Sequence, residues 1–153
     1  MLRLVCVLIV MAIPALLTAG DDDVRKELKA LQGTWKAVAL EAGGKALPKQ
    51  VVPDFLFIVA ADGKAIGRMG KVEYEANIRV DAKKDPKTID NIHESGVHKG
   101  KKQFGVYKLE ADKWIVCMTA PGAQESDRPK SFETKDSRNV VFTFERLKED
   151  KKP

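Results

Sequence analysis

Two histidines, His93 and His98, are the residues most suited to chemistry. They lie five positions apart, with Asp90 and Glu94 beside them. Imidazole and carboxylate groups are the ligands that zinc prefers, but a site needs at least three of them in a suitable arrangement. Neither the spacing nor a third ligand is convincing here. We therefore expect an exposed pair of loop histidines and no metal.

The potential nucleophiles have little support around them. Ser95 lacks the glycine pattern of a nucleophile elbow. Cys117 lies within an apolar strand, where a buried thiol is inert. Carboxylates mostly alternate with lysines along the strands, so no catalytic pair stands out. The sequence predicts no catalytic residue, no cofactor and no enzyme activity.

Arg128 lies in a polar loop over residues 122–137, which is long for a hairpin connection. Long loops often carry function. If the strands of the chain form a β-barrel, Arg128 is a candidate for recognising a carboxylate at its mouth. Capping a turn is an equally open interpretation.

The charge balance argues against nucleic acid as a partner. The chain has 27 basic and 22 acidic residues among 153, a formal net charge of +5. The lysines are single or paired, without the basic runs and interleaved aromatics that follow a phosphate backbone. Most of them are expected on solvated faces of strands.

The first twenty residues have the plan of a secretory signal peptide: Arg3, an apolar run over residues 4–17, and small residues before three aspartates. The run is shorter than the roughly twenty residues that span a bilayer. We expect cleavage before Gly20 or Asp21, export to the periplasm or beyond, and no stable membrane insertion; an uncleaved anchor is the alternative. Cleavage removes Cys6, so Cys117 has no disulfide partner.

The remaining chain is expected to form one domain over residues 21–148, followed by a charged tail at residues 149–153. Helical spacing predicts a short helix at residues 21–32. From Gly33 onward the period changes to two, which predicts strands at 34–40, 55–60, 64–69, 72–80, 88–93, 103–109, 114–119 and 140–147. Eight short strands with hairpin turns and no intervening helices predict an all-β fold, an antiparallel up-and-down barrel. A two-sheet sandwich is the alternative.

Several short motifs resemble the planctomycete lipocalin-like domain family, a group of mostly uncharacterised exported bacterial proteins. The resemblance covers residues 24–148 and is carried by Leu31-Gln32-Gly33-Thr34-Trp35, Pro86-Lys87-Thr88-Ile89-Asp90, Gly105-Val106-Tyr107-Lys108-Leu109, Cys117, Ala120-Pro121-Gly122, Arg128-Pro129 and Phe132. It implies a lipocalin-type barrel with no established activity. It also implies that Gly33 and Trp35 begin the first strand and that Arg146, near the end of the last strand, packs across Trp35. The lipocalin disulfide is absent, and the chain is shorter than most secreted ligand carriers.

Alternation along the strands predicts which residues face the barrel interior and are candidates for ligand contact. They are Ala37, Ala39, Phe57, Tyr74, Ala76, Ile78, Tyr107 and Phe142; Ile115 and Cys117 are placed on the same face. The favoured function is non-catalytic binding of a small apolar or amphipathic ligand in the barrel. The alternative is a cell-envelope module with a solid core that binds a partner protein.

Overall fold

A computed structural model describes residues 19–148 of the chain. The predicted signal peptide, apart from Ala19 and Gly20, and the predicted charged tail lie outside these residues. The described elements are α1 (Ala19–Leu31), β1 (Gly33–Ala42), β2 (Lys45–Ala46), η1 (Lys49–Val51), β3 (Phe55–Val59), β4 (Lys64–Met69), β5 (Val72–Asp81), β6 (Lys87–His93), β7 (Lys102–Glu110), β8 (Lys113–Met118), η2 (Glu125–Asp127) and β9 (Val140–Arg146).

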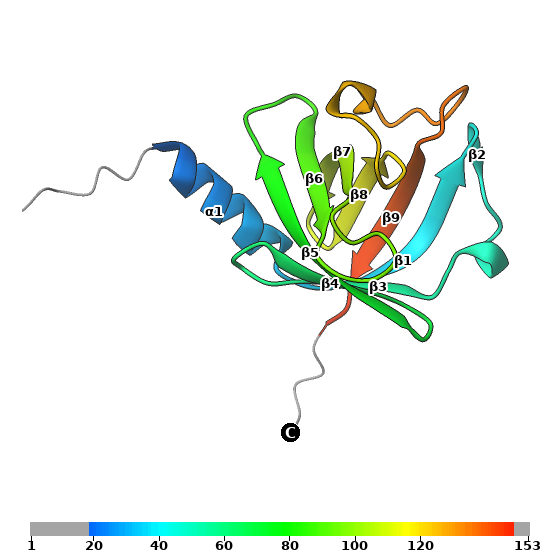
Figure 1. Ribbon diagram of the computed structural model, residues 1–153, viewed down its shortest axis with the longest axis horizontal. Helices are drawn as coiled ribbons and strands as arrows, with labels where there is room; N and C mark the ends of the chain where they lie inside the picture. Colours follow the sequence, from blue (N-terminus) through cyan, green and yellow to red (C-terminus); the bar gives the residue numbers. More distant parts are fainter. Residues whose placement is uncertain (1–18, 149–153) are drawn as a thin grey trace, which may run out of the picture.

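Within residues 19–148, nine strands form one antiparallel sheet that closes on itself (Figure 1). Strands β3 to β9 follow one another as neighbours, and β1 pairs with β3 on one side and with β9 on the other. The two-residue strand β2 pairs antiparallel with the last two residues of β1 and takes no part in closing the barrel. The predicted eight-stranded barrel with a preceding helix is confirmed, and the sandwich alternative is wrong because a sandwich would leave β1 and β9 unpaired.

Helix α1 closes one end of the barrel. Asp21 and Asp22 in its first turn suit the positive end of the helix dipole. Its apolar face carries Leu28 and Leu31, which join the core cluster of the barrel and are 8% and 0% exposed. Figure 1 shows the helix beside β5. In the turn after β5, Lys83 forms an ion pair with Asp23 of the helix at 3.7 Å. The barrel therefore has a covered end.

The seam between β1 and β9 is fixed by Trp35 and Arg146. Trp35 is fully buried and pairs with Arg146 in the strand register. The guanidinium carbon lies 4.1 Å from the centroid of the indole ring, within the range of a cation–π contact. Arg146 also donates to the carbonyls of Ala30 and Gln32 at the end of α1. One side chain thus joins the last strand, the first strand and the helix.

A β-bulge corrects one part of the predicted interior. Between Ala37 and Ala39, the β1–β9 register shifts by one residue. An extra residue reverses the faces of those that follow it. Ala39, predicted to face inward, is therefore exposed, while Ala37 remains buried.

Strand β8 also differs from the prediction. Its inward residues are Trp114 and Val116, which belong to the main core. Cys117 faces the opposite side and packs with Val106 and Val141. Both faces of β8 are apolar because the loop after it covers the outer one, so alternation alone could not show which face was inside.

The two ends of the barrel have different connections. Short turns join β3 to β4, β5 to β6 and β7 to β8 at the end that α1 covers. The opposite end carries the β1–β3 connection, the loop between β6 and β7, and the long segment between β8 and β9. Long loops at one end leave room for an opening there.

Candidate functional site

The candidate site is a cavity inside the barrel with a volume of about 230 Å³. Its walls come from inward-facing residues of every strand from β3 to β9. It reaches the surface beside Met69, which is 43% exposed, and Pro121. Both residues lie at the end of the barrel opposite α1.

Aromatic rings form much of the cavity wall. Trp114 packs against Phe57 and Phe144, with ring centroids 5.9 and 5.5 Å apart. Phe55 and Phe142 continue this wall, with their rings 5.7 Å apart. The packed rings offer an apolar surface on which a small molecule can lie.

Two inward glycines leave room for larger side chains across the strands. A Cβ atom at Gly67 would lie 2.2 Å from the ring of Tyr74, and one at Gly105 would lie 2.2 Å from the sulfur of Met118. Both distances are far shorter than van der Waals contact. The glycines let Tyr74 and Met118 lie flat against the barrel wall, so these side chains line the cavity without filling it.

Polar side chains from β6 and β7 form a hydrogen-bonded network on another part of the wall. The Gln103 side-chain N–H donates to the carbonyl of Thr119 at 2.9 Å. Its Oε1 accepts from Asn91 Nδ2 at 3.1 Å and lies 2.9 Å from His93 Nε2. Because that oxygen can only accept, His93 carries a proton on Nε2. The network therefore fixes the orientation of the Asn91 and His93 side chains.

Three polar atoms of cavity-lining residues have no hydrogen-bond partner within the described part of the chain. They are the indole nitrogen of Trp114, Oδ1 of Asn91 and Nδ1 of His98. Trp114 and Asn91 are only 1% and 6% exposed. Buried polar groups normally have partners, so three orphans around one cavity mark a place where a bound molecule or water can supply them.

Burial changes the proton affinity of two side chains in the wall. It raises the pKa of Tyr74 to about 12, while the Asn91 side chain acts in the opposite direction. Burial also lowers the pKa of His93; the hydrogen bond with Gln103 opposes this shift and the nearby His98 adds to it. Both groups are consequently neutral near pH 7, and the cavity carries little charge.

The structure brings together four of the predicted ligand-contact residues. Phe57, Tyr74, Ile78 and Phe142 all line the cavity. Sequence reasoning missed Asn91 and Gln103, together with the orphaned indole of Trp114. The alternation of Ile89, Asn91 and His93 in β6 was the available signal, because it puts polar residues on the same face as a core isoleucine.

The other four predicted residues lie outside the cavity wall. Ala37 and Ala76 are buried elsewhere, and Ala39 is exposed after the bulge. Tyr107 points toward the covered end, where its hydroxyl donates to Glu27 at 2.9 Å. Lys87 binds the same carboxylate oxygen at 2.7 Å. At this end of the barrel, the polar side chains of Tyr107, Lys87 and Glu27 are therefore hydrogen-bonded to one another.

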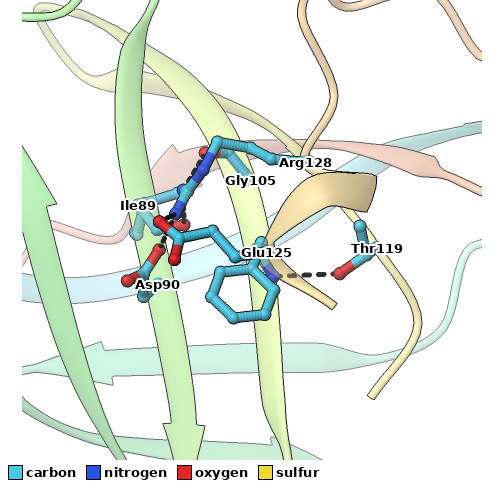
Figure 2. Close-up of polar contacts among 7 residues, drawn as sticks. Ile89, Asp90, Gly105, Thr119, Glu125 and Arg128 are labelled. Carbon is cyan, nitrogen blue, oxygen red and sulfur yellow. Dashed lines mark hydrogen bonds and ion pairs between the residues drawn. The ribbon is translucent and has the colours of Figure 1, made fainter. Parts of the chain in front are cut away.

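Arg128 does not face the barrel mouth. Figure 2 shows its guanidinium against the outer side of β6 and β7, where it pairs with Asp90 at 2.7 Å and donates to the carbonyls of Ile89 and Gly105. It also lies 5.1 Å from the centroid of the Phe104 ring. Since the guanidinium of Arg128 is already paired with Asp90, this residue anchors the loop between β8 and β9 to the barrel wall.

The expectation of an exposed pair of loop histidines is wrong, because His93 lies in β6, is only 4% exposed and lines the cavity together with His98. The rings of His93 and His98 are 5.6 Å apart, but within residues 19–148 no group of three or more His, Cys, Asp or Glu side chains is placed to hold a metal. Cys117 lies on the outer face of β8, and burial together with the charge of Glu41 raises its pKa to about 11. Its thiol is therefore protonated at neutral pH.

The fold and the cavity define the class of protein: a closed antiparallel β-barrel with one covered end and an apolar internal cavity. No family model, curated protein or solved structure matches the chain. In the part of the chain that is described, no helix has the length and apolar character needed to cross a membrane.

Proposed function

We propose that this chain is an exported, lipocalin-like protein that binds a small apolar or amphipathic molecule in its barrel and catalyses no reaction. The observation that carries the proposal is the cavity of about 230 Å³, whose lining residues supply aromatic rings and carry three polar atoms without a hydrogen-bond partner in the described part of the chain. Apolar walls with a few oriented polar groups are the usual composition of small-molecule sites.

The alternative, a cell-envelope module that binds a partner protein, requires no internal space. Two wider depressions, of about 740 and 570 Å³, lie on the outer surface and include charged side chains such as Glu75 and Lys84. They suit solvent better than an apolar ligand. The internal cavity favours the carrier, because an unused cavity lowers the stability of a core.

Native mass spectrometry of the protein purified from its own cells tests the proposal. We expect the wild-type protein to retain a small molecule. Val116→Phe, which puts a larger side chain into the cavity wall, should remove the extra mass. Val72→Phe makes the same change at a side chain that is 62% exposed and should retain it.

Two outcomes would contradict the carrier. One is a consistent absence of any small mass in the wild-type protein, with a protein that co-purifies in its place. The other is retention of the same mass by Val116→Phe, which would put the molecule outside the barrel. N-terminal sequencing of the same sample tests export separately, since cleavage should leave Gly20 or Asp21 as the first residue.

A further inference from the structure

The orphaned atoms of the cavity also restrict the chemistry of its ligand. We propose that the ligand is an uncharged molecule about the size of one substituted aromatic ring, with a hydrogen-bond acceptor for Trp114 and a donor for Asn91. A phenol that carries a second oxygen meets these requirements. This inference rests on the proposed function, since it concerns the same cavity.

The volume limits the size of the ligand. Small-molecule sites commonly have volumes of about 300 to 1,000 Å³, and an apolar cavity of about 150 Å³ binds benzene. The cavity here, at about 230 Å³, lies between these values. It has room for a six-membered ring with a few substituent atoms, but is small for a long acyl chain or a fused polycyclic molecule.

The wall excludes a charged ligand. None of the described residues that line the cavity is Asp, Glu, Lys or Arg. The imidazole of His93 is kept neutral by burial. A carboxylate or ammonium group inside would lose its hydration without gaining a counter-ion, which is costly in an apolar environment.

The polar demand of the wall is specific because the donor and acceptor roles are fixed. An indole nitrogen can only donate, so Trp114 requires an acceptor. Asn91 donates through Nδ2 to Gln103, which leaves Oδ1 as an acceptor that requires a donor. His98 Nδ1 can take either role and offers a third contact.

The second tryptophan provides an internal comparison. Trp35 is as deeply buried as Trp114, but its indole N–H donates to the carbonyl of Leu31 at 2.8 Å. Of the two indole N–H groups, only that of Trp114 lacks a hydrogen-bond partner within residues 19–148. These are the two tryptophans of the chain, so its NMR spectrum contains two indole N–H signals.

Titration with 4-hydroxyacetophenone, followed by NMR at pH 6.5, tests the inference directly. This neutral probe has a carbonyl acceptor and a phenol donor on one ring. We expect the Trp114 indole N–H signal to move downfield as the hydrogen bond forms. The Trp35 signal should move much less, because its N–H keeps the same acceptor.

Three related probes test each requirement by calorimetric titration. 4-Ethylphenol lacks the acceptor and 4-methoxyacetophenone lacks the donor, so each should bind about 3- to 10-fold more weakly than 4-hydroxyacetophenone. 4-Hydroxybenzoate has a similar shape but carries a charge, and its affinity should fall by more than about 100-fold.

Two variants assign the contacts to their residues. Trp114→Phe removes the N–H while keeping a ring, and should reduce the preference for 4-hydroxyacetophenone over 4-ethylphenol. Asn91→Leu should reduce the preference for 4-hydroxyacetophenone over its methoxy analogue. Tyr107→Phe removes a buried polar group at the covered end and is the matched control, which should keep both preferences.

The outcomes separate the inference from the proposed function. Equal binding of all four probes in the wild-type cavity would overturn the inference. The protein would then be a carrier that does not select its ligand by donor, acceptor or charge. Failure of every probe, with a charged molecule retained by the protein from its own cells, would also overturn only the inference. Failure of every probe with no retained molecule would overturn both.

Discussion

The two ends of the barrel use buried polar groups in opposite ways. At the covered end, Tyr107 and Lys87 share the carboxylate of Glu27, and the indole of Trp35 donates to Leu31. Around the cavity, Asn91 and Trp114 have atoms without hydrogen-bond partners among the described residues. An unsatisfied buried polar group costs about 1 to 3 kcal/mol. The covered end is thus arranged for stability, whereas the cavity keeps a cost that a ligand can offset.

Trp35→Ala should produce the largest change in stability. The indole is fully buried at the seam and contacts Trp114, with ring centroids 5.5 Å apart. Replacing a buried aromatic side chain with alanine typically costs about 3 to 5 kcal/mol, because the cavity left behind closes only partly. Urea unfolding followed by circular dichroism measures this loss.

The neighbouring residue provides the control for that experiment. Lys36 is exposed on the same strand, so Lys36→Ala should change the free energy of unfolding by less than about 0.5 kcal/mol. A loss below about 1 kcal/mol for Trp35→Ala would show that the seam does not hold the barrel closed.

Arg146→Met should have a smaller effect at the same end. Methionine keeps an apolar stem but removes the cation–π contact with Trp35, about 1 kcal/mol, and the hydrogen bonds to the end of α1. We expect a total loss of about 2 kcal/mol by urea unfolding. The ion pair with Asp112 adds little, since that aspartate is 63% exposed.

A conservative variant sharpens the interpretation of Arg146. Arg146→Lys keeps the charge but loses the planar fork that reaches both carbonyls. It should recover only part of the stability that Arg146→Met loses. Full recovery would mean that charge alone, and not stacking on Trp35, accounts for the contribution of Arg146.

The covered end was also the more predictable from sequence. Gly33 and Trp35 follow a short helix, and Arg146 ends the last strand, so a resemblance pointed to the pair that the structure places in contact. The alternation that predicted strands at 55–60, 64–69 and 72–80, joined by hairpin turns, agrees with the antiparallel pairing of β3, β4 and β5. These features depend on residues close in sequence or on one strong motif.

The cavity was less predictable because its geometry depends on contacts between distant strands. The extra residue in β1 that exposes Ala39 has no signature in the residue types. Cys117 looked like an inward residue, but Phe132 from the following loop packs against its cluster on the outer face. The orphaned state of Trp114 depends on what lies near one nitrogen atom, which alternation of side chains cannot show.

The smallest expected effect is a change of the free energy of unfolding with pH. It arises from His93, which lines the cavity. The pKa of His93 is lowered in the folded protein, so the unfolded chain binds more protons as the pH falls below its ordinary value of about 6.5. Stability from this residue is therefore present above about pH 6.5 and is lost as the pH falls toward the folded pKa. Urea unfolding midpoints at pH 7.5, 6.5 and 5.5 measure the loss.

Two substitutions show whether burial of His93 causes that loss. His93→Gln removes the titrating group and should flatten the dependence between pH 7.5 and 5.5. His98→Gln removes only a neighbouring charge, and because burial is the larger cause of the lowered pKa, most of the dependence should remain. If His98→Gln flattened the curve as fully as His93→Gln, repulsion between the two imidazoles would be the dominant cause, and the cavity wall would be less apolar than its lining indicates.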